Sequence, residues 1–346
     1  MKTYNVIGLM SGTSCDGLDI AFCQFIFKNE KWSFDIVASK MVEYSSDWRT
    51  KLKNTFRLSN SELTKLDTDL GIYFGNETKQ FIEENKLTGI DFIASHGHTI
   101  FHKPDEDFTL QIACGKEIKK AAGLPVINDF RSADVAAGGQ GAPLVPIGDE
   151  LLFSEFDYCL NIGGIANISY KEKGIRKAKD VCFANMALNP LALEMGYEYD
   201  DKGHLAAQGV INPQLLWKLQ ALDFDGKSLG IEQYNEFFLP ILEKSPSIAE
   251  TKIATVTEYL ALKIAEKLTE NSTLLITGGG AYNLFLIEKI KQYSKANVVK
   301  ASKELIEFKE ALIFAFLGVL KMENIPNCLA SVTGAKEDVV GGVLVE

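Results

Sequence analysis

Residues 7–19 read IGLMSGTSCDGLD, and the interpretation of the rest of the chain starts from this stretch. An apolar run from Tyr4 leads into it, and apolar residues resume at Leu18. Apolar runs on both sides of a short Ser/Gly/Thr-rich segment are typical of two strands joined by a tight turn. We therefore expect a strand, a polar turn and a returning strand at the start of the chain.

The turn has the composition of a phosphate-binding loop. Its glycines let backbone N–H groups point into one concavity, and the hydroxyls of Ser11, Thr13 and Ser14 add donors. The carboxylates of Asp16 and Asp19 would hold Mg²⁺ beside a phosphate, directly or through water. A solvated hairpin turn is the alternative, because short glycine motifs often occur by chance. A second copy of the pattern would favour the phosphate interpretation.

Size and composition limit the classes of protein to consider. A chain of 346 residues is long for one core, so we expect two lobes. The formal net charge of −10 argues against a nucleic-acid binder, because phosphate backbones need a basic surface. The six cysteines have no CxxC spacing, and no apolar run has the length of a membrane helix. A cytoplasmic protein with reduced thiols and no membrane partner is expected.

The segment SHGHTIFHKP, residues 95–104, holds three of the four histidines. His96, His98 and His102 lie at spacings that permit zinc ligation, a structural hydrogen bond or contact with a substrate. No cysteine or carboxylate lies nearby at ligand spacing, which disfavours zinc. The segment follows an expected buried strand over residues 90–94, and polar residues at the end of such a strand suit a cleft.

Residues 129–146 read DFRSADVAAGGQGAPLVP and form the densest motif of the chain. A glycine-rich segment of this kind is either an interdomain linker or a structured hinge that contacts the ligand. We favour the hinge, because Arg131 is flanked by Asp129 and Asp134 and bulky Leu144 follows directly. The expected division is an N-terminal lobe of residues 1–130, joined by 326–346, and a C-terminal lobe of residues 131–325.

The second half of the chain repeats the opening pattern. Residues 158–162 predict a strand, Gly163 and Gly164 a tight turn, and residues 165–170 a returning strand, with amides offered by Asn161 and Asn167. Two lobes that each begin in this way suggest an internal duplication. Two such hairpins would hold one polyphosphate from both sides.

A third glycine corner follows the expected strand of residues 274–276. Residues 277–283 read TGGGAYN and precede an expected helix, an arrangement in which backbone amides and the helix dipole attract an anion or nucleotide. The order of the three corners fits the two phosphate segments and the adenosine segment of the actin-like, hexokinase-like ATPases. The strings of a Walker A loop and of a dinucleotide-binding Rossmann fold are absent from the sequence.

Two carboxylates have alternative interpretations. Asp180 lies in KDVCFANMALN, ahead of a helix expected from Pro190, and is either a general base or an acid stabilised by the helix dipole. Glu310 is expected near the start of a helix over residues 308–322, as an exposed acid or as a carboxylate in a cleft.

Five motifs together resemble the anhydro-N-acetylmuramic acid kinase family over nearly the whole chain: GLMSGTSCDGLD, SHGHT, DFRSADVAAGGQGAPLVP, NIGGIANIS and TGGGAYN. The resemblance implies an α/β, two-lobed, actin/hexokinase-like (ribonuclease H-like) fold with a central ATP cleft. It also implies a cytoplasmic, homodimeric carbohydrate kinase of peptidoglycan recycling. Such an enzyme converts 1,6-anhydro-N-acetylmuramic acid, ATP and water into N-acetylmuramic acid 6-phosphate and ADP with Mg²⁺.

The resemblance also assigns roles to residues. A 1,6-anhydro sugar has no free 6-hydroxyl, so water must attack C1 while the bridging oxygen attacks the γ-phosphorus, and a carboxylate must take the proton of the water. Asp180 aligns with the aspartate of the family's D-T-G-P-G-N and would be that base, with Glu310 helping to hold the water. The sugar site would be lined by His98, Arg131, Asp134 and Gln140. The ATP-binding residues would be Gly12, Thr13, Ser14, Cys15, Asp16, Gly17, Leu18, Asp19, Asn161, Gly163, Gly164, Asn167, Gly278, Gly279, Gly280 and Asn283.

The chain departs from the family pattern in one segment. Residues 180–185 read DVCFAN, so the acid and the amide are present but both glycines and the proline are replaced. Because Cys and Ala are strained where glycine has a positive φ, we expect this loop to follow a different path. Two alternatives stay open: a kinase of the same fold for another amino sugar, and a pseudokinase that senses nucleotide or muropeptide. Retention of Asp180 and of every glycine in the three corners argues against the pseudokinase.

Overall fold

The computed structural model describes residues 1–103, 106, 108–224 and 228–346. The chain forms two compact units, the first made of Met1–Phe153 with Phe308–Glu346 and the second of Ser154–Glu307. The expected boundary after residue 130 lies inside the first unit, so Arg131 and the glycine-rich segment belong to that unit. The chain re-enters the first unit at Phe308, within a helix, and not at residue 326.

The first unit contains a mixed seven-stranded sheet in the order β12-β6-β4-β1-β2-β3, with β5 paired to β4. Strands β1, β2 and β3 are antiparallel neighbours, whereas β1, β4 and β6 are parallel. Its elements are β1 (Lys2–Ser11), β2 (Gly17–Lys28), β3 (Lys31–Glu43), α1 (Ser46–Lys53), α2 (Asn60–Glu84), β4 (Phe92–Lys103), β5 (Phe108–Ile112), α3 (Gly115–Ala122), β6 (Val126–Asn128), α4 (Ser132–Ala136), α5 (Pro146–Leu151), α13 (Lys303–Met322), α14 (Ala330–Thr333) and β12 (Val343–Val345).

The second unit contains a five-stranded sheet in the order β11-β10-β7-β8-β9. Its first three strands are again antiparallel, and β7, β10 and β11 are parallel. Its elements are β7 (Tyr158–Ile162), β8 (Ile165–Glu172), β9 (Ile175–Phe183), α6 (Asn185–Glu194), α7 (His204–Gln208), α8 (Pro213–Gln220), α9 (Ile231–Gln233), α10 (Leu239–Glu243), α11 (Ala249–Ala265), β10 (Thr273–Thr277), α12 (Leu284–Ser294) and β11 (Asn297–Lys300).

The two sheets have the same core topology. In each, a three-stranded antiparallel meander is followed by two parallel strands on the other side of the first strand, and the first sheet adds β12 and β5 at its margin. This is the ribonuclease H-like arrangement, so the expected α/β class and the internal duplication are confirmed. Each strand–turn–strand hairpin therefore lies at the same place in its own sheet.

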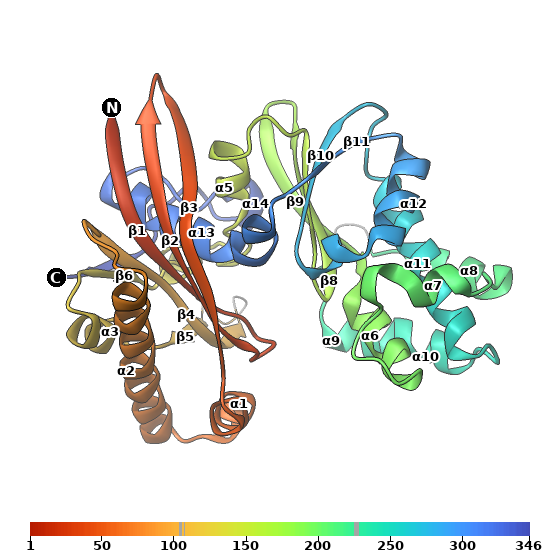
Figure 1. Ribbon diagram of the computed structural model, residues 1–346, viewed down its shortest axis with the longest axis horizontal. Helices are drawn as coiled ribbons and strands as arrows, with labels where there is room; N and C mark the ends of the chain where they lie inside the picture. The colour runs from red at the N-terminus through yellow and green to blue at the C-terminus, as the bar shows by residue number, and fades with distance from the viewer. Residues whose placement is uncertain (104–105, 107, 225–227) are drawn as a thin grey trace. The chain divides into compact units, whose positions relative to one another are not determined.

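Helices cover both faces of the first sheet (Figure 1). The long helix α2 begins with a capping box formed by Ser59 and Glu62 and packs its buried residues against the face that carries Ile7 and Leu9. On the opposite face, α13 approaches β1 so closely that a Cβ at Gly8 would overlap the carbonyl oxygen of Ala311. Only glycine fits at this crossing, because the helix backbone occupies the space of a side chain.

The core of the second unit lies between its sheet and helices that include α6, α8 and α11. Along α11, the residues from Ile253 to Ala261 are all buried, which explains the apolar spacing of this segment. Within the described residues, no helix combines the length and the apolar character needed to cross a bilayer.

Two expected helix starts are wrong. Helix α6 begins at Asn185 and contains Pro190 in its interior, so it does not start at the proline. Helix α13 begins at Lys303, so Glu310 lies well inside the helix and not near its start. In both cases tertiary packing extends the helix beyond the segment that local sequence signals mark.

Candidate active site

The turn between β1 and β2 has the predicted strand–turn–strand form. Inside the turn, the N–H of Cys15 donates to the carbonyl of Gly12 at 3.1 Å. Cys15 has a φ of 58°, a left-handed conformation that is uncommon for a residue with a side chain. The side chains of Thr13, Ser14 and Asp16 are exposed, so the outer donors of the turn face solvent.

A chain of buried polar groups lies behind the turn. The hydroxyl of Tyr44 is 2.7 Å from Ser11 Oγ, and Ser11 Oγ is 2.9 Å from His98 Nδ1. The other ring nitrogen of His98 lies 3.9 Å from Cys15 Sγ. Desolvation lowers the pKa of His98 to about 4, so the ring is neutral at physiological pH. His98 thus contacts the first glycine turn, a neighbour that the sequence did not indicate.

His96 uses both ring nitrogens within the protein. Its Nε2 accepts from the Nε of Arg131 at 3.0 Å, and its Nδ1 is 3.0 Å from the carbonyl oxygen of Gly97. Burial, together with the charge of Arg131, holds the pKa of His96 well below its usual value. No group of three His, Cys, Asp or Glu side chains in the described part of the chain is placed to hold a metal. The structural interpretation of His96 is confirmed.

Arg131 is a half-buried cation with neutral partners. Besides its bond to His96, it donates from Nη1 to the carbonyl of Gly141 at 2.6 Å, and its guanidinium lies 5.9 Å from the ring centre of Phe314. Burial lowers the pKa of Arg131 to about 10, although the charge of Glu310 opposes this shift. Among the described residues, no carboxylate forms an ion pair with this guanidinium. Such a cation is suited to an anionic ligand group.

The glycine-rich segment after Arg131 is a structured loop of the first unit, so the linker interpretation is wrong. The carboxylate of Asp134 accepts from the N–H of Gly141 and from the hydroxyl of Thr333, each at 2.7 Å. Asp134 is fully buried, and a Cβ at Gly139 would overlap its carboxylate. Asp134 therefore supports the loop and has no surface for a ligand, which corrects its expected sugar contact. Gln140 is exposed at the tip of the loop.

The other two glycine corners lie side by side in the second unit. Thr277, at the end of β10, pairs with Asn161 at the end of β7. A Cβ at Gly278 would come within 2.7 Å of Asn161 Oδ1, and a Cβ at Gly280 would overlap the side chain of Ile162. Gly278 also has a φ of 78°, which favours glycine. The two corners pack together because the glycines of the third corner leave room for the side chains of Asn161 and Ile162.

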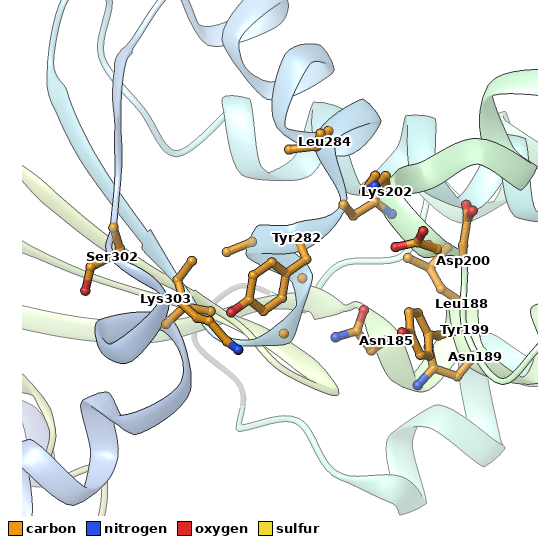
Figure 2. Close-up of a pocket in the computed structure, with 17 residues that line it drawn as sticks. Asn185, Leu188, Asn189, Tyr199, Asp200, Lys202, Tyr282, Leu284, Ser302 and Lys303 are labelled. Atoms are coloured by element: carbon orange, nitrogen blue, oxygen red, sulfur yellow. The ribbon is translucent and has the colours of Figure 1, made fainter. Parts of the chain in front are cut away.

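A pocket of about 790 Å³ opens beside these corners (Figure 2). The sequence predicted Gly279, Gly280 and Asn283 among its lining residues, and the Asn283 side chain also caps α12 through a bond to the N–H of Leu286 at 3.0 Å. Sequence analysis missed the residues that come from separate segments and carry no motif, which are Leu188, Asn189, Tyr199, Asp200, Asp201, Lys202, Ser302, Lys303 and Ile306. Asn185 also lines the pocket, and its place at the end of the segment that aligns with D-T-G-P-G-N could have indicated this. The pocket has the size of a small-molecule site.

Tyr282 and Tyr199 give the pocket aromatic surface. In Figure 2 Tyr282 lies beside Lys303, and Tyr199 lies near Asn185 and Asn189. The hydroxyl of Tyr282 donates to Glu307 at 2.9 Å. Aromatic rings and a few polar groups around a cavity suit a ligand that has a flat base and hydrogen-bonding edges.

Asp180 lies within β9, where it pairs with Asn167 across the sheet. Its carboxylate accepts from the N–H of Leu229 at 2.8 Å. This hydrogen bond lowers the pKa of Asp180, but desolvation raises it by more. It also lines a cavity of about 30 Å³ with Tyr259 and Lys263, large enough for a water molecule. A raised pKa makes the carboxylate a stronger base.

Where a loop was expected after Asp180, the chain continues as a strand. The strand continues through Phe183, with Val181 as the extra residue of a β-bulge opposite Ala166 and Asn167. The segment from Val181 to Ala184 is buried and none of its residues has a positive φ, so the replaced glycines cause no strain. β-Branched and aromatic residues favour a strand here, where Gly and Pro would end one.

The remaining carboxylates lie in the first unit. Glu310 has solvent access, yet surrounding protein desolvates its carboxylate and raises its pKa, against the opposing charges of Arg131 and Lys309. Asp16 is exposed and Asp19 is half-buried at the glycine turn. Two carboxylates fit Mg²⁺, which takes one or two such ligands and fills its other positions with water and phosphate oxygens.

Comparison with known proteins places the chain in a family. Residues 4–346 match the family model described as anhydro-N-acetylmuramic acid kinase. The chain belongs to the anhydro-N-acetylmuramic acid kinase family. A protein of that name from Mannheimia succiniciproducens is 33% identical, with 99% of each chain covered. Another from Bacillus cereus is 31% identical, with 97% of this chain and 98% of the relative covered.

Solved structures resemble the chain more weakly. Component A of the (R)-2-hydroxyglutaryl-CoA dehydratase of Acidaminococcus fermentans matches with a TM-score of 0.44 at 13% identity, covering 90% of this chain and 96% of that one. Our fold assignment for this member of the anhydro-N-acetylmuramic acid kinase family therefore rests on the strand order of its two sheets.

Proposed function

We propose that this chain is an ATP-dependent carbohydrate kinase that opens 1,6-anhydro-N-acetylmuramic acid with water and phosphorylates O6. The products are N-acetylmuramic acid 6-phosphate and ADP, and the reaction serves peptidoglycan recycling. Membership of the anhydro-N-acetylmuramic acid kinase family over residues 4–346 is the observation that supports this proposal most strongly.

The adenosine of ATP would occupy the pocket of the second unit. Its volume of about 790 Å³ suits a nucleoside, and Gly279 and Gly280 leave the backbone accessible at its wall. The rings of Tyr199 and Tyr282 offer apolar faces to a purine. Asn161, Gly163, Gly164 and Asn167 would contribute to the same nucleotide through the neighbouring turn.

The turn of residues 12–19 in the first unit would bind phosphate. Its exposed Thr13 and Ser14 add hydroxyl donors to the backbone N–H groups. Asp16 and Asp19 would hold Mg²⁺ by direct or water-mediated contact, and the ion would offset the negative charge of the transferring phosphoryl group. Cys15, Gly17 and Leu18 would shape this turn.

Arg131 would bind the carboxylate that distinguishes a muramic acid from its parent amino sugar. The guanidinium is partly desolvated, is held by neutral His96, and lacks an ion-pair partner among the described residues. An acidic substituent on the sugar would therefore gain a charge-assisted hydrogen bond. Exposed Gln140 would add a contact with the sugar, whereas His98 is 2% exposed and would act through the neighbouring turn, without touching the sugar.

Asp180 would take the proton of the attacking water. Its raised pKa supports this role, since a stronger base removes the proton more readily. Water would attack C1 of the sugar, the bond from C1 to the bridging oxygen would break, and that oxygen would attack the γ-phosphorus with release of ADP. Glu310 would help to orient the water.

Incubation with Mg-ATP and 1,6-anhydro-N-acetylmuramic acid in ¹⁸O water tests the proposal. Mass analysis should find one ¹⁸O at C1 of the product and none in the phosphate. Absence of any phosphorylated product would contradict the function. The strand at Val181–Phe183, in place of the family's glycine-rich loop, favours one alternative, a kinase for another amino sugar. A panel of anhydro and free amino sugars would identify that case.

Location and assembly complete the proposal. We infer a cytoplasmic homodimer, as in the sequence-based expectation. The free cysteines, five of the six buried, suit a reducing compartment. Sedimentation of the purified chain would test the dimer.

A further inference from the structure

Tyr44 contacts both ends of the first glycine turn. It directly follows β3, and its backbone N–H donates to the carbonyl of Asp16 at 3.0 Å, near the start of β2. Its hydroxyl reaches Ser11 Oγ at the end of β1, at 2.7 Å. Tyr44 is 2% exposed, so it cannot be a ligand contact itself. Tyr44, at the end of a third strand, thus forms hydrogen bonds with both strands that carry the turn.

The hydrogen bonds behind the turn have one consistent direction. The buried hydroxyl of Tyr44 has no other acceptor among the described residues, so it donates to Ser11. Ser11 then donates its own hydrogen to His98 Nδ1, which leaves the ring hydrogen on Nε2. That nitrogen faces Cys15 Sγ at 3.9 Å, and the thiol of Cys15 points on to the carbonyl of Thr13 at 3.5 Å.

The neighbouring histidine has the opposite arrangement. His96 accepts from Arg131 at Nε2, so its ring hydrogen is on Nδ1 and donates to the carbonyl of Gly97. Two histidines in one H-x-H segment are therefore neutral and hold their hydrogens on different nitrogens. Each tautomer is set by the group that donates to the ring.

We propose that Tyr44 is a positioning residue for the phosphate-binding turn, acting through Ser11 and His98 on Cys15. This inference rests on the proposed function, in which the turn binds the phosphates of ATP. The left-handed conformation of Cys15 needs outside support, and the hydrogen-bond chain supplies it at the side chain while the Tyr44 N–H holds the adjacent carbonyl. The hydroxyl of Tyr44 orders the turn before ATP arrives.

Tyr44→Phe removes only this hydroxyl. We expect the Kd and the KM for ATP to rise about three- to tenfold, the range for one net hydrogen bond, with the KM for the sugar unchanged. In ¹⁵N spectra, His98 should change from the Nε2–H tautomer to a mixture, because Ser11 becomes free to accept from Nδ1–H. Loss of signals in a His98→Gln variant assigns the ring. The protein has four histidines, so the spectrum is simple.

Tyr73→Phe is the matched control. The Tyr73 ring lies 5.9 Å from that of Tyr44, outside the hydrogen-bond chain, and its hydroxyl removal should leave ATP affinity and the His98 signal unchanged. Ser11→Ala breaks the same chain one step later, so the double variant with Tyr44→Phe should lose no more ATP affinity than Ser11→Ala alone. Ser11→Ala also provides the test should Tyr44→Phe fail to fold.

Several results would overturn the inference. Unchanged ATP affinity in Tyr44→Phe would do so, with or without a shifted tautomer, as would an equal loss in Tyr73→Phe or additive losses in the double variant. A wild-type protein that neither binds nor uses ATP would instead contradict the proposed function, and that measurement comes first.

Discussion

The two units build the same hairpin in different ways. The β1–β2 turn has side-chain support in addition to its backbone hydrogen bonds, since Tyr44, Ser11 and His98 form buried hydrogen bonds behind it. The β7–β8 turn is held by backbone contacts: Gly163 and Gly164 accept from the first N–H groups at the start of α6, and Gly280 packs on Ile162. A shared topology thus leaves the local chemistry of each turn free to diverge.

This difference predicts different sensitivities. The first turn depends on hydroxyl and imidazole groups, so it responds to pH and to loss of single polar atoms. The second packs against Gly280 of the neighbouring corner, where no side chain fits, so it responds to volume added at that residue. The proposed catalytic carboxylates are also divided between the units, with Glu310 in the first and Asp180 in the second.

Neutralising a proposed catalytic carboxylate, Asp180 or Glu310, should produce the largest loss of kcat. We expect Asp180→Asn to lower kcat on the order of 10²-fold or more while the Kd for ATP stays nearly constant, because an amide cannot accept the proton of the water. Glu310→Gln should cause a smaller loss, because its proposed role is to orient the water. Steady-state kinetics and calorimetric titration with ATP measure the two quantities.

Asp223→Asn is the control for Asp180→Asn, since it neutralises an acid that lines the same small cavity. Its kcat should stay close to the wild-type value. Wild-type turnover in Asp180→Asn would refute the role of Asp180 as the base. A larger loss of kcat in Glu310→Gln than in Asp180→Asn would assign that role to Glu310.

The pH dependence of stability should come mainly from the first unit. His98 has a pKa of about 4 in the folded chain and near 6.5 when unfolded, so the unfolded state binds more protons between these values. The contribution of His98 to the free energy of unfolding should be complete above pH 6.5 and should decrease as the pH drops toward 4. At pH 5 the loss should be about 2 kcal/mol. His96 contributes in the same direction.

Urea unfolding between pH 7.5 and pH 5 measures this loss. His98→Gln should flatten the pH dependence, since it removes the titrating ring. His204 is the one histidine of the second unit and is exposed, so His204→Gln should leave the slope as in the wild type. Identical slopes in the wild type and in His98→Gln would show that the buried ring titrates normally.

Sequence reasoning identified what depends on local signals. The glycine corners and the repeated hairpin each depend on a short segment, and the structure has both. The support of the first turn could not be found in this way, because Tyr44, Ser11 and His98 are far apart in the chain and meet only when β1, β3 and β4 assemble. Asp134 was misassigned for the same reason, since its partner Thr333 comes from the other end of the sequence.

Adding a single methyl group at Gly12, in the first turn, and at Gly280, which packs on the end of β7, should give the smallest difference and the sharpest test of the comparison. At Gly280 a Cβ would overlap Ile162 Cγ2 and come within 2.6 Å of Ile162 Cβ, and Ile162 is fully buried, so it cannot move aside without cost. Gly280→Ala should therefore lower the free energy of unfolding by about 1–3 kcal/mol, the usual range for overpacking.

At Gly12 the nearest atom to a new Cβ is Ser14 Oγ at 3.6 Å, and the residue does not have a positive φ. Gly12→Ala should leave the free energy of unfolding within about 0.5 kcal/mol of the wild type, as for most open surface positions. Urea unfolding of the two variants measures the change in the free energy of unfolding at each position. Equal losses would mean that the first turn is also closely packed at Gly12, whereas the expected contrast would show that the first turn has room for a side chain at Gly12 while the corner contact of the second unit requires a glycine at residue 280.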